Sequence, residues 1–162
     1  MGAQEELHVK ESLMNSPESL SLLRDSLVKV ALEWQQKFGV APHITSAISE
    51  YDVALLVGCS EADYSTQMAI RTAVGRGYDF IHANERYQVK ANRPSGKPGS
   101  PVTLVSNPTN DEWDRLVWVL YDKNFVMQEA WAWRLEEFRQ EFQPKQRLSP
   151  AHMRRGLRLY KA

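Results

Sequence analysis

The sequence is short of cysteine and of long apolar runs, and each shortage excludes a class of protein. Cys59 is the single cysteine among 162 residues, which excludes an internal disulfide and a zinc cluster of cysteines. The longest apolar runs, residues 53–57 and 116–121, are far below the roughly 18 residues that a membrane span needs. The acidic N-terminal residues are followed by no apolar stretch, so no secretory signal is recognised. These absences predict a cytoplasmic protein with no membrane partner.

The chain also has no net charge, because its 20 Lys and Arg residues balance its 20 Asp and Glu residues. A neutral chain argues at first against nucleic-acid binding, since such domains are usually basic. The charge is nevertheless sorted by segment, because residues 71–97 carry an excess of four positive charges and residues 145–162 an excess of six. Residues 1–63 and 109–141 are acidic in compensation. The two basic segments are therefore candidates for polyanion binding, although a solvated basic tail explains the second one equally well.

The chain has enough apolar side chains for a hydrophobic core, since 43% of the residues are hydrophobic and 10% aromatic. The length predicts one domain over residues 1–162, with residues 1–15 flexible and residues 145–162 forming a basic C-terminal segment. Ser16 and Pro17 are typical of a helix start, and apolar residues then recur every three or four positions as far as Phe38. A second helix is expected from Thr45 or Ser46 to Gly58, with Glu50 beside its apolar stripe.

The pattern then changes from helical to alternating. We expect strands at residues 78–82, 86–92, 102–105, 115–121 and 125–133, the fourth buried on both faces, and two further helices at residues 135–142 and from Ser149 to Gly156.

The first two strands form a hairpin whose register depends on its turn. A turn at Ala83 and Asn84 places Asp79 opposite Gln88, whereas a turn at Asn84 and Glu85 places Asp79 opposite Lys90. Both registers put a carboxylate, an amide and an ammonium on one face, because side chains alternate along a strand. An ordinary solvent-facing hairpin with an ion pair of about 0–1 kcal/mol explains the same residues.

The order of these motifs resembles the PD-(D/E)XK nuclease superfamily, the restriction endonuclease-like fold. The matching residues are Glu50 on the second helix, Asp79 in Gly-Tyr-Asp-Phe-Ile, and Lys90 in Tyr-Gln-Val-Lys-Ala. The resemblance covers roughly residues 44–135. It implies an α/β fold with a central mixed sheet flanked by helices, to which this chain adds an N-terminal helix.

The resemblance also implies a Mg²⁺-dependent endonuclease that hydrolyses phosphodiester bonds of double-stranded DNA, in restriction, defence or repair, with Mn²⁺ as a substitute ion and no organic cofactor. Asp79, Glu50 and the backbone carbonyl of Val89 would hold the metal ion, Gln88 would assist, and Lys90 would serve catalysis. One departure from the family pattern is that Gln88 stands where an acid is usual. It predicts weaker metal binding, and it keeps open a degenerate, non-catalytic member.

Partners follow from the same interpretation. The candidates for phosphate contact are Arg93, Lys97, Arg154, Arg155 and Arg158. Cutting both strands with one site per chain would require a homodimer, for which the acidic residues 109–141 or the tryptophan-rich strand are available. Two other functions stay open: a nucleic-acid-binding module that keeps the fold without the reaction, and a subunit that binds a protein partner.

Overall fold

The computed structural model describes residues 17–71, 77–144 and 147–162. Its helices and strands, in chain order, are α2 (Pro17–Phe38), α3 (Thr45–Leu56), α4 (Glu61–Ile70), β1 (Phe80–His82), β2 (Glu85–Asn92), β3 (Arg115–Tyr121), β4 (Met127–Arg134), α5 (Leu135–Phe142), α6 (Pro150–Met153) and β5 (Leu157–Lys161). The expected flexibility of residues 1–15 and the cap at Ser16 lie outside the described residues.

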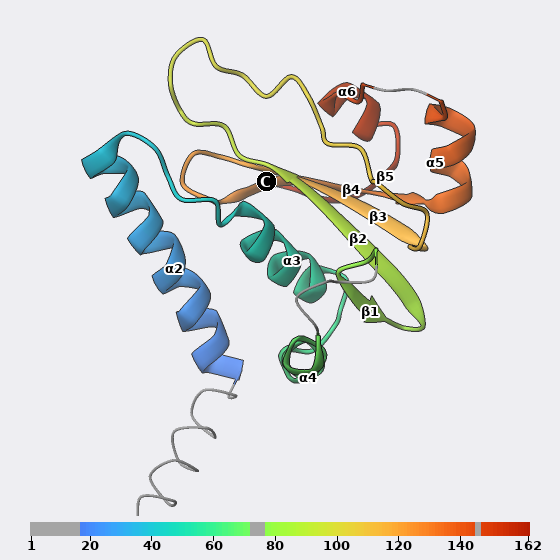
Figure 1. Ribbon diagram of the computed structural model, residues 1–162, viewed down its shortest axis with the longest axis horizontal. Coiled ribbons are helices and arrows are strands. Elements are labelled where there is room, and N and C mark those ends of the chain that lie inside the picture. Colours follow the sequence, from blue (N-terminus) through green and yellow to red (C-terminus); the bar gives the residue numbers. More distant parts are fainter. Residues whose placement is uncertain (1–16, 72–76, 145–146) are drawn as a thin grey trace, which may run out of the picture.

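The strands form one mixed sheet in the order β1-β2-β3-β4-β5. β2 and β3 are parallel, and every other neighbouring pair is antiparallel. In Figure 1, α3 lies on one face of the sheet with α2 on its outer side, while α5 and α6 lie beyond the other face. The expected α/β architecture, a mixed sheet flanked by helices, is confirmed at this level.

The hairpin of β1 and β2 adopts the first of the two expected registers. Phe80 pairs with Tyr87 and His82 with Glu85, which leaves Ala83 and Asn84 as a two-residue turn. Their φ angles are +49° and +61°, as a type I′ turn requires. The antiparallel register therefore places Asp79 opposite Gln88.

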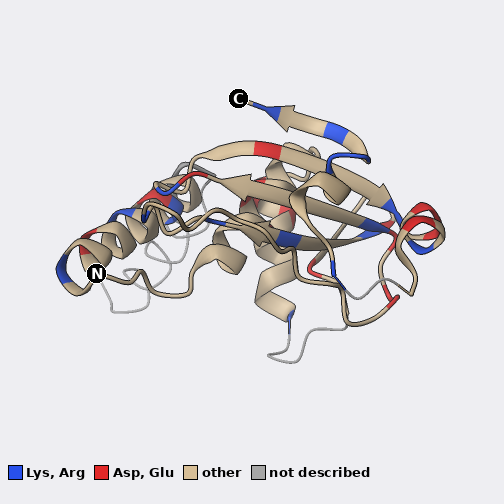
Figure 2. Cartoon of the chain, turned by 90° about the horizontal axis from the view of Figure 1, so that it is seen from above, with Lys and Arg blue, Asp and Glu red and all other residues tan. Residues whose placement is uncertain are grey.

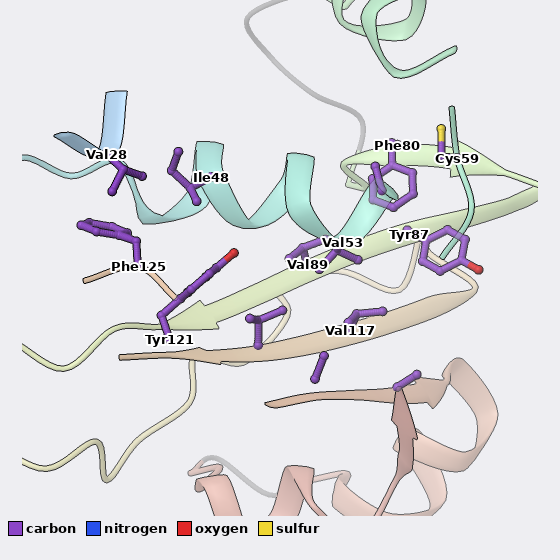
Figure 3. Packing of buried hydrophobic residues seen from close by; sticks show 14 of the residues in the cluster. Val28, Ile48, Val53, Cys59, Phe80, Tyr87, Val89, Val117, Tyr121 and Phe125 are labelled. Carbon is purple, nitrogen blue, oxygen red and sulfur yellow. The ribbon is translucent and has the colours of Figure 1, made fainter. Parts of the chain in front are cut away.

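One core layer lies between the sheet and α3 (Figure 3). Alternate residues of β3 point into it, Val117, Val119 and Tyr121, and meet Ile48 and Val53 of α3. β1 and β2 add Phe80, Tyr87 and Val89, and the lone thiol of Cys59 is buried beside them, as the sequence indicates. This layer packs the helix that carries Glu50 against the strand that carries Lys90.

The second layer lies on the opposite face and contains most of the tryptophans. Trp113 and Trp118 are fully buried and Trp133 nearly so, packed with Phe138 of α5 and Met153 of α6. Burial of each of these side chains contributes roughly 2–3 kcal/mol. The tryptophans of this layer thus belong to the core, and a dimer interface on the tryptophan-rich strand stays a prediction.

The second layer also corrects the expectation for Tyr78. The alternating pattern predicts that Tyr78 shares a face with Phe80, but Tyr78 packs in the second layer instead. The regular strand begins only at Phe80, so the alternation does not extend back to Tyr78.

The long helix α2 departs from expectation in its burial. Its apolar stripe predicts a core-facing side, yet Leu23, Val30, Trp34 and Phe38 are each more than half exposed. The residues of α2 that belong to the buried core, Val28 and Ala31, lie beside that stripe. Only part of the wide apolar surface of α2 is thus packed against the chain.

Two elements exist that the sequence pattern did not predict, and one predicted strand is absent. α4 and β5 were missed, whereas residues 102–105 form no strand among the described residues and contribute only an isolated bridge from Val105 to Leu148. Val105 follows a stretch with three prolines, which cannot donate the hydrogen bonds of a ladder. Within the described ranges, no helix has the length and apolarity needed to cross a membrane.

Candidate functional site

Four predicted residues come together where α3 passes the end of the hairpin. Glu50 projects from α3, Asp79 precedes β1, and Gln88 and Lys90 lie on β2. The carboxyl groups of Glu50 and Asp79 are close enough to interact directly, and Lys90 is near enough to lower the pKa of Asp79. The tertiary fold thus joins a helix and two strands in one polar site.

Asp79 is held firmly by the hairpin itself. Its Oδ2 accepts hydrogen bonds from the Val89 backbone N–H at 2.6 Å and from Gln88 Nε2 at 3.0 Å. Its own N–H donates to the Tyr87 carbonyl at 2.7 Å. Because the side chain of Asp79 takes the place of a strand partner for Val89, these hydrogen bonds fix the orientation of its carboxylate.

The approach to Asp79 requires glycine at Gly77. Gly77 has a φ of +60°, and a Cβ added there would lie 2.5 Å from Glu112 and 2.6 Å from Asn110. The positive φ strains any residue other than glycine, and a Cβ would force the side-chain ends of Glu112 and Asn110 to move. Glycine therefore suits the backbone that leads into Asp79.

The sequence pattern missed a residue that joins the two carboxylates, Arg71. Its Nη1 lies 3.2 Å from Glu50 Oε2, and its Nη2 lies 3.5 Å from Asp79 Oδ1. Nη1 also donates to the Asp79 carbonyl at 3.3 Å. The guanidinium therefore acts as the counterion of a pair of like charges.

α4 places Arg71 at the site by docking on the free edge of β1. The side-chain amide of Gln67 accepts from the Ile81 N–H at 2.7 Å and donates to the Ile81 carbonyl at 2.8 Å. In this way Gln67 satisfies the exposed strand edge as another strand would. Ser60 accepts from the Asp63 N–H and caps the helix start, a sequence signal that would have predicted α4.

The site disfavours negative charge on its carboxyl groups. Burial, followed by the charge of Asp79, raises the pKa of Glu50 to about 7, although Arg71 opposes the shift. Burial also raises the pKa of Asp79, against the opposing effects of the Val89 N–H and of Arg71. Two carboxylates that are costly to ionise together are typical of a position that a cation completes.

Tyr64 of α4 borders the same site and was also missed. Burial raises the pKa of its hydroxyl, and the nearby charge of Glu50 adds to this effect. Its ring packs edge-on against Phe80, with 6.3 Å between the centroids. Tyr64 therefore contributes a neutral hydroxyl beside the carboxylates.

The oxygen donors fit a hard divalent cation in kind, but they are few. No group of three His, Cys, Asp or Glu residues that could hold a metal ion occurs within residues 17–71, 77–144 and 147–162. Glu50 and Asp79 supply carboxylates, while Gln88 uses its amide nitrogen toward Asp79 and retains an amide oxygen. A cation bound by both carboxylates would have to replace the Arg71 guanidinium.

Arg93, one of the predicted phosphate contacts, is engaged within the fold. Its Nε donates to the Lys123 carbonyl at 2.9 Å, its Nη2 donates to Gln35 Oε1 at 2.6 Å, and its guanidinium stacks 4.2 Å from the Phe125 ring. Lys97, in the same loop, is exposed. Of these two, the exposed lysine is the better placed to meet an external phosphate.

The basic C-terminal residues lie at the other edge of the sheet from the candidate site. Arg154 forms ion pairs with Glu129, and Arg155 with Glu141. Arg158 is exposed on β5, which three strands separate from β1. Figure 2 shows the basic residues of β5 next to the acidic position of β4.

The acidic segment 109–141 is correspondingly neutralised from within the chain. Asp111 pairs with Arg139 at 2.7 Å and Asp114 with Arg86 at 2.9 Å. Asp111 and Arg139 both belong to the segment, whereas Asp114, Glu129 and Glu141 pair with arginines outside it. Other acids of the segment, Glu112, Glu136 and Glu137, are exposed, so its docking role stays a prediction.

No family model matches the chain, and no curated protein sequence matches it.

Proposed function

We propose that this chain is a nuclease that depends on a divalent cation and hydrolyses phosphodiester bonds of DNA through the site of Glu50, Asp79, Gln88 and Lys90. The observation that carries the proposal is the pair of carboxyl groups, Glu50 and Asp79, brought together from separate elements beside a lysine. A merely solvated hairpin would leave Asp79 free of Glu50 and of Arg71. The resemblance to the PD-(D/E)XK superfamily supports the same function.

In this proposal Glu50, Asp79 and the Val89 carbonyl hold Mg²⁺ or Mn²⁺, and the amide oxygen of Gln88 assists. When bound, the cation would supply Lewis acidity toward the phosphate and lower the pKa of a coordinated water. The raised pKa of Glu50, about 7, supports the fit, because a cation would stabilise the ionised pair. Without a bound cation, the Arg71 guanidinium stabilises the ionised carboxylates instead.

The remaining residues have distinct tasks. The hairpin keeps Asp79 in one orientation through the Val89 N–H and Gln88. Lys90 would neutralise the charge that develops on the phosphoryl oxygens as the water oxygen bonds to phosphorus and the leaving ester oxygen departs. Arg71, once released from the carboxylates, would be available to a phosphate oxygen.

One observation favours a second candidate, a DNA-binding module without cleavage. The amide of Gln88 replaces an acid, and its nitrogen is committed to Asp79. With only two carboxylates, the site could bind a phosphate through Arg71 and Lys90 without retaining a metal ion. Such a module would bind DNA in a salt-dependent way that chelators do not change.

The test is cleavage of plasmid, linear duplex, single-stranded DNA and RNA with Mg²⁺, Mn²⁺ or EDTA. Asp79→Asn and Lys90→Met each remove one charge of the site, while Glu136→Gln and Lys29→Met are matched controls at exposed positions. Calorimetric titration with Mn²⁺ provides a readout that does not depend on cleavage.

We expect cation-dependent cleavage by the wild type and the two controls, a loss of at least about 100-fold in Lys90→Met, and a loss of Mn²⁺ binding in Asp79→Asn. Cleavage that survives both site substitutions would refute the site. DNA binding without cleavage or Mn²⁺ uptake by the wild type would select the binding module, and absence of DNA binding at low salt would select a protein-interaction role.

A further inference from the structure

The exposed side of α2 is a narrow apolar stripe with the spacing of a helix-pairing seam. Its members recur at intervals of four, three, four and four residues: Leu23, Leu27, Val30, Trp34 and Phe38. At about 100° per residue these positions fall within an arc of roughly 80°. Their exposed fractions are 62%, 39%, 58%, 52% and 59% in the same order.

This stripe is distinct from the side by which α2 is attached to the domain. Attachment uses Arg24, Val28, Ala31 and Gln35, which bind or pack against α3, the sheet and the loop after β2. Polar residues such as Lys29, Glu33 and Gln36 occupy the opposite, solvent side. The seam therefore forms a second apolar face that no described segment covers.

The exposed area is sufficient for a dimer. The five side chains expose on the order of 500–600 Å² together, so that pairing two such faces would bury on the order of 1,000 Å² before flanking residues are counted. That total reaches the minimum of about 1,000 Å² that a biological interface should bury. A patch of this size on one helix is at the upper end of what isolated monomers expose.

We propose that the α2 seam pairs with the same seam of a second copy of this chain, the two helices running antiparallel. This arrangement satisfies two-fold symmetry, since Leu27 then meets the partner's Val30 and Leu23 meets the partner's Trp34. Trp34 thus faces an aliphatic side chain, and Leu27 and Val30 lie near the symmetry axis. The pairing goes beyond the proposed reaction and does not depend on it.

The chain offers a direct test by disulfide cross-linking, because its native thiol at Cys59 is buried. Leu27→Cys and Val30→Cys are introduced singly and mixed under mild oxidation, with Gln36→Cys on the solvent side of the same helix as the control. We expect a cross-linked dimer of the two seam variants in high yield and little or none of the control. Equal cross-linking by Gln36→Cys would overturn the proposal.

The mass in solution provides an independent readout. Light scattering at about 50 µM is expected to give twice 18.6 kDa for the wild type and 18.6 kDa for Leu27→Glu/Val30→Glu. Lys29→Glu is the matched charge control and should remain dimeric. Both seam positions are solvent-exposed in the single chain, so the variants should keep the wild-type circular dichroism. A wild type that stays at 18.6 kDa, leaving the seam to another kind of partner, would refute the pairing.

Discussion

Two carboxylates on α3, Glu50 and Asp52, show how one helix can build both a structural contact and a reactive site. Two residues along a helix turn the side chain by about 200°, so the two groups face different surroundings. Asp52 accepts from Arg24 at 3.0 and 2.8 Å and from the Tyr121 hydroxyl at 2.7 Å. Glu50 has one ion pair, at 3.2 Å with Arg71, and faces another acid.

The difference lies in how completely each charge is compensated. Around Asp52, donors outnumber acids, and the contact joins α2, α3 and β3 into one unit. Around Glu50, two acids share a single arginine. A fully satisfied carboxylate stabilises the fold, whereas an under-compensated one keeps affinity for an incoming cation.

The largest expected effect comes from removing Asp52, the carboxylate whose charge is well compensated. Asp52→Ala leaves the partly buried Arg24 and the hydroxyl of Tyr121 without their acceptor, so we expect the free energy of unfolding to fall by about 3 kcal/mol. Urea denaturation at pH 7 measures it. Asp25→Asn removes an exposed partner of the same arginine and should change stability by less than about 0.5 kcal/mol. Equal effects of the two substitutions would contradict the assignment of Asp52 as structural.

At Glu50, by contrast, removal of the carboxylate is expected to raise the free energy of unfolding. Its folded pKa of about 7 lies above the ordinary value of 4.5, so between these pH values the folded chain holds a proton that the unfolded chain has released. In EDTA, the stability of the wild type should therefore decrease by about 1–2 kcal/mol as the pH rises from 5 to 8. Glu50→Gln should lack this decrease and be the more stable protein at pH 8. An unchanged pH profile in Glu50→Gln would argue against a costly charge at this position.

Removal of Arg71, the counterion of Glu50 and Asp79, is expected to change the affinity for a metal ion. Arg71→Met leaves Glu50 and Asp79 without the guanidinium that competes with a cation, so Mn²⁺ should bind about tenfold more tightly, which corresponds to about 1.4 kcal/mol. Calorimetry in the absence of DNA measures the affinity. Arg86→Met, which removes the exposed partner of Asp114, is the control and should leave Mn²⁺ affinity unchanged. Weaker binding in Arg71→Met would mean that the arginine organises the site rather than competing for it.

The smallest effect is expected from adding a third carboxylate. Gln88→Glu replaces a donor to Asp79 with another negative charge and should lower metal-free stability by about 1 kcal/mol. It should also strengthen Mn²⁺ binding by several-fold, because it supplies an additional anionic oxygen ligand. Thermal melts with and without Mn²⁺ measure both effects. Gln128→Glu, a half-buried amide on β4, is the control.

Much of the local structure follows from the sequence. The helices that became α2, α3 and α5 and the strands that became β2, β3 and β4 are predicted within a few residues, because their apolar periods are strong. The hairpin was narrowed to two registers, of which the turn at Ala83 and Asn84 selected one. The convergence of Asp79, Gln88 and Lys90 required only strand alternation.

The missed elements have weak internal signals and depend on neighbours. α4 buries no residue fully and is attached through Gln67 to the edge of β1. β5 is largely exposed and pairs with β4, so its strand conformation comes from an available edge rather than from its own pattern. Arg71 and Tyr64 were missed for the same reason, since both reach the site only through α4.

The sequence by itself thus determined the periodic elements and one face of the hairpin, because those depend on the spacing of side chains within a segment. The family resemblance had already predicted that Glu50 and Asp79 share a site. Only the tertiary structure decided that Asp52 meets Arg24 and that a guanidinium lies between Glu50 and Asp79. It also decided which side of α2 is buried. Such pairings depend on how separate segments dock, and the docking is set by the packing of both core layers together.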